Sequence, residues 1–107
     1  MSIEDNKALI RRWIEARNSS DLEAALALWV NEMHERLTHA FNQFTQAFPD
    51  LHVTIEEMIA EGDKVCVRWM YRATVKGKQA AATGMHLFRI TGGKIEEFWI
   101  NMNEAGA

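Results

Sequence analysis

The stretch "LHVTIEEMIAEGDKVCVRWMYRATV", residues 51–75, alternates apolar and polar side chains over much of its length. Such alternation is typical of strands that bury one face. Gly62 and Asp63 interrupt the alternation, and a glycine-containing pair between two such runs is typical of a hairpin turn. The stretch therefore predicts two antiparallel strands. The second strand has an apolar face made of Val65, Val67, Trp69, Tyr71, Ala73 and Val75.

Two more strands are expected toward the C-terminus. "KGK" at 76–78 turns the chain again, a third strand runs to about Ile90, and a fourth follows "TGG" at 91–93. Glycine favours such turns because it adopts backbone conformations that most residues avoid. The pattern predicts a meander of four antiparallel strands.

The turn at 91–93 decides which side chain faces His86, and two registers are open. A three-residue loop pairs His86 with Phe98 and places it diagonal to Ile100. A two-residue loop made of the two glycines shifts the pairing by one, so that His86 faces Trp99. Neither register places a carboxylate beside the histidine.

The segment ahead of the strands is predicted to be helical. Leu9, Ile10, Trp13 and Ile14 recur at helical spacing. "ARNSSD" breaks this run, and its second serine has capping-box spacing to a glutamate in "LEAALALW" that follows. This pattern predicts a second helix capped by Ser20.

A third helix is expected to end at Phe48, because Pro49 disfavours helical geometry in the residue before it. Its apolar stripe consists of Met33, Leu37, Phe41, Phe44 and Phe48. Three helices followed by a four-strand antiparallel meander define an α+β fold. The 107 residues are expected to form a single domain, residues 1–107, with the helices covering one face of the sheet.

Composition excludes several classes of partner. The net charge is −3 and no basic stripe is present, so neither nucleic acid nor an anionic membrane is an expected partner. Cys66 is the single cysteine, which is typical of a reducing compartment. The polar N-terminus does not resemble a signal peptide, and no apolar run reaches the roughly 20 residues that span a bilayer. A cytoplasmic location is expected.

Metal binding is not predicted. His34 and His39 in "HERLTH" are five positions apart, whereas the zinc motif on a helix needs histidines four apart to share a face. Two solvated histidines on a helix are the simpler interpretation.

An apolar ligand pocket is predicted from the aromatic content. The chain has four tryptophans and six methionines, more aromatic and adaptable surface than a minimal core needs, although core packing alone would give a similar composition. His86 is the sharpest candidate for chemistry, and its alternative role is a satisfied core histidine. The predicted pocket residues are Trp13, Trp29, Trp69, Tyr71, His86, Phe98, Ile100 and Met102.

Three stretches together resemble a known family. They are "NKALIRRWIEARNSSDLEAALALW", "AFPDLHVTIEEMIAEGDKVCVRWMYRAT" and "GMHLFRITGGKIEEFWINMNEAG". They are similar to the SnoaL-like polyketide cyclase (ester cyclase) branch of the nuclear transport factor 2-like superfamily. The resemblance implies a curved antiparallel sheet wrapped against helices as a cone with an apolar pocket, usually as a homodimer through the outer sheet face.

The resemblance also implies a chemistry, of which one part is missing here. In the cyclases an aspartate, helped by a histidine, is the acid and base of an intramolecular aldol step, without metal or organic cofactor. The family histidine matches His86. The family aspartate follows the hairpin tryptophan, where this chain has Ile100, and a further acidic position is Asn103. Neither side chain can take up a proton, so we expect the family's acid and base to be absent.

Two shortened stretches are expected to leave the pocket more open, or covered by a partner chain. "VNEMHERLTHAFNQFTQ" continues as helix where relatives have a strand and loop, and "TVKGKQAAATG" is short. The first hypothesis is a binder of a hydrophobic small molecule, polyketide-like or otherwise. The alternatives are a cofactor-free cyclase, isomerase or hydrolase that uses His86 with a relocated carboxylate such as Glu57 or Glu96, and a dimeric interaction module.

Overall fold

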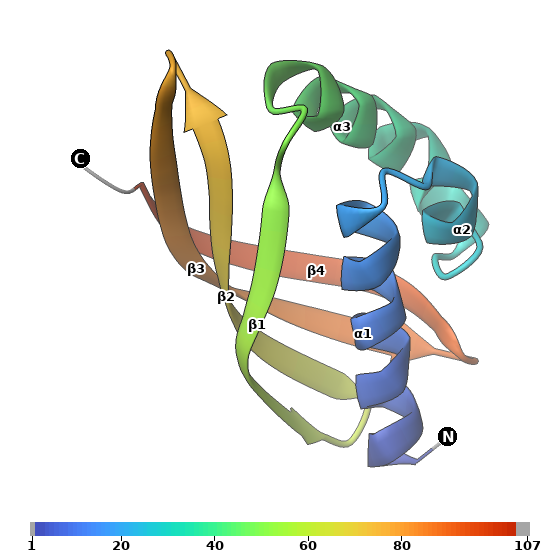
Figure 1. Cartoon of the computed structure of the whole chain (residues 1–107). Coiled ribbons are helices and arrows are strands. Elements are labelled where there is room, and N and C mark those ends of the chain that lie inside the picture. The colour runs from blue at the N-terminus through green and yellow to red at the C-terminus, as the bar shows by residue number, and fades with distance from the viewer. Residues whose placement is uncertain (1, 105–107) are drawn as a thin grey trace.

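The computed structural model describes residues 2–104, and their side chains as far as Asn101. The elements are α1 (Ile3–Asn18), α2 (Leu22–Leu26), the 3₁₀ turn η1 (Asn31–Met33), α3 (His34–Ala47), β1 (His52–Glu61), β2 (Lys64–Val75), β3 (Lys78–Thr91) and β4 (Lys94–Glu104). The strands are ordered β1-β2-β3-β4, each antiparallel to the next (Figure 1). This α+β order of three helices and a meander confirms the predicted fold class. None of the helices in this part of the chain is long and apolar enough to cross a membrane.

Capping side chains set where the first two helices begin. Ser2 and Asp5 form a capping box at the start of α1, with each side chain bonded to the other's backbone N–H. The cap of α2 is Asp21, whose Oδ1 accepts the backbone N–H of Ala24 at 3.0 Å. The prediction of Ser20 as the cap was wrong by one residue. Ser20 has a φ of 52° in the turn that ends α1, whereas an N-cap residue needs an extended backbone.

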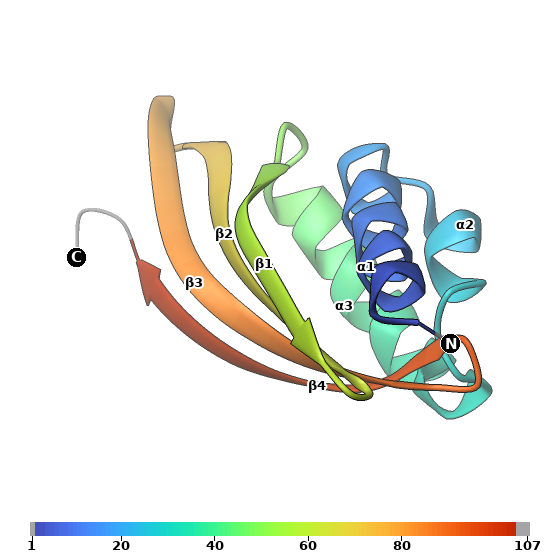
Figure 2. The ribbon, with the colours of Figure 1, turned by 90° about the horizontal axis from the view of Figure 1, so that it is seen from below.

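The sheet is strongly curved, and the helices lie in its concave side (Figure 2). Two bulges interrupt the ladders. In β1 the pairing steps from Ile55 to Glu57, and in β4 it steps from Ile95 to Glu97, so that Glu56 and Glu96 are extra residues. A bulge of this kind bends its strand and increases the local twist. The bulges therefore contribute to the concave shape that receives the helices.

The β3–β4 hairpin has neither of the two predicted registers. Gly92 and Gly93 form a two-residue turn with φ of 57° and 79°, as one alternative assumed. The bulge at Glu96 then moves the pairing back by one residue. His86 lies opposite Ile100, and Phe98 lies opposite Phe88. The two-glycine turn was predictable from the sequence, whereas neither predicted register contained a bulge.

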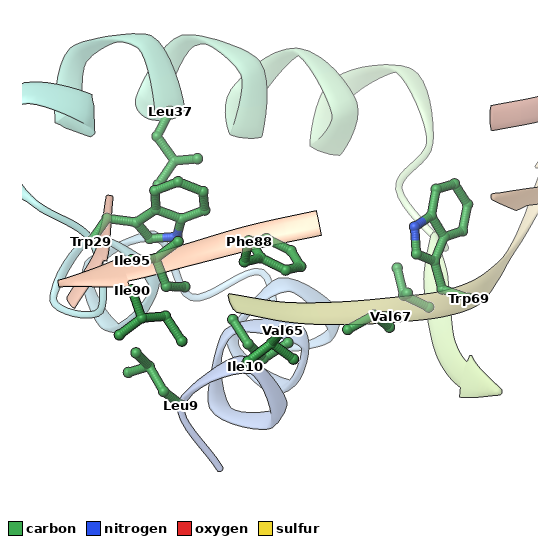
Figure 3. Packing of buried hydrophobic residues seen from close by; sticks show 11 residues of the cluster. Leu9, Ile10, Trp29, Leu37, Val65, Val67, Trp69, Phe88, Ile90 and Ile95 are labelled. Atoms are coloured by element: carbon green, nitrogen blue, oxygen red, sulfur yellow. The ribbon is translucent and has the colours of Figure 1, made fainter. Parts of the chain in front are cut away.

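The core fills the space between α1, α3 and the concave sheet face. Figure 3 shows Trp29 beside Leu37 and Ile95 at one end of the core, Phe88 in the middle and Trp69 at the other end. The buried cluster consists of Leu9, Ile10, Trp29, Leu37, Val53, Val65, Val67, Trp69, Phe88, Ile90 and Ile95. Burying large side chains of this type stabilises a fold by about 1.5–3 kcal/mol each. The inward faces predicted for the second strand and the first helix are thus observed, except that Val75 at the end of β2 is exposed.

The side chain of Asn18 joins the end of α1 to the edge strand β1. Its Oδ1 accepts the backbone N–H of Val53 at 2.7 Å, and its Nδ2 donates to the carbonyl oxygen of Val53 at 2.9 Å. At the other side of the sheet, Leu28 and Val30 exchange backbone hydrogen bonds with Ile95 of β4. Both contacts fix the helical layer against the sheet and satisfy backbone groups at its edges.

Candidate ligand-binding cavity

A cavity of about 130 Å³ lies between α1, α3 and the concave face of the sheet. Its lining is almost entirely aromatic and aliphatic, and its polar members are Arg17, Tyr71 and His86. The lining residues are Trp13, Ile14, Arg17, Leu37, Ala40, Phe41, Phe44, Val53, Val67, Trp69, Tyr71, His86, Phe88, Phe98 and Ile100. Two lining residues, Phe44 of α3 and Ile100 of β4, are exposed, Ile100 at 49%.

Most of the predicted pocket residues meet at this cavity. Trp13, Trp69, Tyr71, His86, Phe98 and Ile100 all contribute to the lining. Trp29 does not belong to it, since its side chain is packed edge-on against Trp13 and Phe98 in the core. The Met102 side chain lies outside the described residues. Aromatic content alone does not distinguish a side chain packed in the core, as Trp29 is, from one in a cavity wall.

His86 is held in a defined tautomer by Trp69. The indole Nε1–H of Trp69 donates to Nδ1 of His86 at 2.5 Å. An indole nitrogen only donates, so Nδ1 of His86 must be the acceptor and the neutral ring carries its proton on Nε2. The ring also stacks on Phe88, with centroids 5.3 Å apart. Burial lowers the pKa of His86 from 6.5 to about 4, so the ring is neutral near pH 7.

This tautomer suits a hydrogen-bond donor better than a base. A neutral imidazole accepts a proton at its unprotonated nitrogen, and in His86 that nitrogen already accepts from Trp69. The protonated Nε2 remains to donate to a carbonyl or other acceptor in the cavity.

Carboxylates are not part of the described lining. Glu57 pairs with Arg68, with 2.7 Å between Oε1 and Nη2. Glu96 and Glu97 both pair with Arg89, also at 2.7 Å. Arg68 and Arg89 belong to strand positions that alternate with the inward-facing ones, so these acids are bound on the outer face of the sheet. Neither Glu57 nor Glu96 is among the residues around His86.

The two histidines of "HERLTH" lie in different surroundings. Nε2 of His34 lies 3.0 Å from the carbonyl oxygen of Trp29, to which it donates. His39 is exposed on α3. Within residues 2–104, no three His, Cys, Asp or Glu side chains are arranged to hold a metal ion.

Arg17 is the polar lining residue that was not predicted from the sequence. It is 7% exposed and lines the cavity, with its guanidinium carbon 4.6 Å from the ring centroid of Phe41. The signal was present in the sequence. Arg17 follows Ile10, Trp13 and Ile14 by seven, four and three positions, so it continues the apolar stripe of α1.

Comparison with known proteins agrees with this architecture. A sequence model of the SnoaL-like polyketide cyclase family matches residues 7–107. The chain therefore belongs to the SnoaL-like polyketide cyclase family. No curated protein sequence matches it.

Solved structures share the fold at low sequence identity. AclR, a proposed hydroxylase from Streptomyces galilaeus, is 23% identical with a TM-score of 0.86, over 96% of this chain and 81% of AclR. IdmH, a proposed polyketide cyclase from Streptomyces antibioticus, is 21% identical with a TM-score of 0.82, over 91% of each chain. An NTF2-like protein from Burkholderia pseudomallei is 20% identical with a TM-score of 0.82, over 96% of this chain and 92% of that one. At these identities the likeness concerns the fold alone.

Proposed function

We propose that this protein binds a small, mainly apolar molecule in the cavity between α1, α3 and the sheet. The observation that carries the proposal is the lining itself, in which aromatic and aliphatic walls surround a few polar groups. Ligand sites in proteins have this composition. The volume of about 130 Å³ is below that of a typical drug-sized pocket and close to that of an apolar cavity known to take benzene. A ligand with one ring, or one ring inserted from a larger molecule, matches this space.

The test is binding of a neutral one-ring probe. Fluorobenzene is titrated into the protein and followed by the relaxation of its fluorine NMR signal. Ala40 lines the cavity, so Ala40→Phe should fill it and abolish binding, whereas Ala24→Phe on the exposed face of α2 should leave binding unchanged. Binding that survives Ala40→Phe, or no binding to the wild-type protein, would contradict the proposal.

We also propose that the family's acid–base step is not performed in this cavity. Support comes from Ile100 opposite His86, from the neutral His86 tautomer, and from the engagement of Glu57 and Glu96 by arginines. Turnover of a polyketide-type ester that His86→Gln abolishes would refute this part. It would favour the alternative of a relocated carboxylate.

The outer face of the sheet is proposed as the contact between two copies of the chain. Ile59, Met85 and Trp99 lie on this face and are 68%, 47% and 45% exposed. Large exposed apolar side chains on one face are typical of an interaction surface. Sedimentation as a monomer at micromolar concentration would contradict this contact between copies.

A reducing, cytoplasmic setting is proposed as well, and the unpaired Cys66 supports it.

A further inference from the structure

Arg17 places a positive charge in the wall of the apolar cavity. The guanidinium lies over the ring of Phe41 at 4.6 Å and beside that of Phe44 at 5.8 Å. Nη1 donates to Oγ1 of Thr45 over a long 3.4 Å, and Nη2 is buried without a hydrogen-bond partner. Most buried donors in folded proteins are satisfied, so an orphaned guanidinium nitrogen requires an explanation.

No described carboxylate compensates this charge. The ion pairs among the described side chains involve Lys64, Arg68 and Arg89. Burial lowers the pKa of Arg17, yet a guanidinium remains protonated in proteins. A buried charge without a partner is strongly unfavourable, and the aromatic rings offset only part of its lost hydration. The cavity is therefore electropositive, and an anion would relieve the imbalance.

The other two polar groups of the lining also present hydrogen atoms. Burial raises the pKa of Tyr71, an effect that the nearby Arg17 opposes, so the phenol keeps its O–H. His86 has its proton on Nε2, because Nδ1 accepts from Trp69. Arg17 supplies a cation, and Tyr71 and His86 supply neutral hydrogen-bond donors. Together they match a ligand group that is negatively charged and accepts several hydrogen bonds.

We propose that the cavity takes a small monocarboxylate with an apolar body of about one ring, and that its carboxylate pairs with Arg17. The inference rests on the proposed binding function and adds the charge of the ligand. Arginine matches a carboxylate with two parallel N–H donors, which explains the unfilled Nη2. The volume of about 130 Å³ limits the body to the size of benzoate or a short branched acid.

The experiment compares benzoate with benzamide, its neutral counterpart of nearly the same shape. Dissociation constants are measured at pH 7 by calorimetry for the wild-type protein and three variants. Arg17→Met keeps the apolar stem and removes the charge, and Arg17→Lys keeps the charge and guards against a folding defect. Arg12→Met is the matched control, since Arg12 is exposed on the same helix.

Wild-type protein and Arg12→Met are expected to bind benzoate about 10- to 100-fold more tightly than benzamide. Arg17→Met should lose this preference and still bind benzamide, and Arg17→Lys should keep part of it. Equal affinities for the two probes in the wild-type protein would overturn the anion proposal and leave the binding function intact. A preference that persists in Arg17→Met would overturn it too. Failure of benzoate, benzamide and fluorobenzene alike would remove both proposals.

Discussion

At the scale of single residues, Trp69 and Ile100 determine the chemical state and the surroundings of His86 in the cavity. Trp69 fixes the tautomer through its hydrogen bond to Nδ1, and Ile100 occupies the position opposite the ring. Burial then keeps the ring neutral at pH values where a solvated histidine would be charged. His86 therefore contributes both to the chemistry of the cavity and to the pH dependence of stability.

The neutral His86 should make the free energy of unfolding depend on pH. The pKa is about 4 in the folded protein and 6.5 for a solvated histidine, so between these values the unfolded chain binds more protons than the folded one. Stability is then nearly complete above pH 6.5 and falls by about 3 kcal/mol as the pH drops toward 4. Urea unfolding across this range measures it. His86→Gln, which can still accept from Trp69, should lack this part of the pH dependence, and identical profiles would contradict the buried neutral ring.

A carboxylate at position 100 should reverse this effect. Ile100 lies directly opposite His86, and residues so paired have Cβ atoms about 4.5–5.5 Å apart. The variant Ile100→Asp is therefore expected to raise the pKa of His86 above about 4, because a nearby negative charge favours the imidazolium. NMR titration of the ring protons measures the pKa. Asn101→Asp is the control, since the next residue points to the opposite face, and an equal rise in both variants would refute the assigned facing.

Which of these residues could be predicted depends on how local their signals are. His86 and its aromatic neighbours were predicted because they recur in phase on inward-facing strand positions. Arg17 was missed because a charged residue on an apolar stripe is usually assumed to extend its end group to solvent. Only the packing of α3 over α1 shows that Phe41 and Phe44 close over the guanidinium.

At the scale of the elements, the attachment of α1 to the sheet depends on Asn18. Its amide makes two hydrogen bonds to the backbone of Val53, on the side of β1 that does not pair with β2. Asn18→Ala removes both bonds and should lower the free energy of unfolding by about 1–3 kcal/mol, with an unchanged denaturant slope. Asn42→Ala on the exposed face of α3 is the control. Equal losses in the two variants would show that the Asn18 contact contributes nothing specific.

The bulges had a sequence signal that alternation alone does not capture. "IEEM" at 55–58 and "IEEF" at 95–98 each place two glutamates between apolar residues. Strict alternation would turn one apolar residue outward, whereas a bulge lets both apolar residues face the core. Glu57 also pairs with Arg68 of the neighbouring strand, and Glu96 and Glu97 both pair with Arg89. Two successive polar residues of this kind would have predicted the correct facing of Ile100.

At the scale of the whole molecule, the order of elements was predictable and the size of the cavity was not. Turn residues and the change of period from helix to strand give the α+β meander directly. The cavity volume depends on how far α3 stands from the curved sheet, which results from many packing contacts at once. The shortened stretches are expected to leave the pocket more open or covered by a partner chain, and this stays a prediction.

The proposed contact between copies should depend on the exposed side chains of the outer face. Trp99 is 45% exposed there, with the guanidinium of Arg89 at 5.9 Å from its ring. Trp99→Lys places a charge at this position and should weaken self-association at least about tenfold, since aromatic anchors carry much of the energy of an interface. Analytical ultracentrifugation measures the dimer constant. Gln43→Lys, at an exposed position of α3, adds the same charge away from the sheet, and an equal effect of both variants would point to general electrostatics.

The bulge at Glu96 has a consequence for how the length of this chain can change over generations. Losing that residue would leave Ile95 and Phe98 separated by one outward residue, so regular alternation would still direct Phe98 and Ile100 inward. Loss of Glu97 gives the same chain, whereas a deletion beyond the two glutamates, at Phe98 or later along β4, would turn the following side chains over. Gene variants that lose the codon for residue 96, or for residue 56 in the matching bulge, would therefore still fold with the same inward-facing side chains, in a flatter sheet. Loss of one residue elsewhere in these strands would turn the following core-facing side chains to the outer face of the sheet.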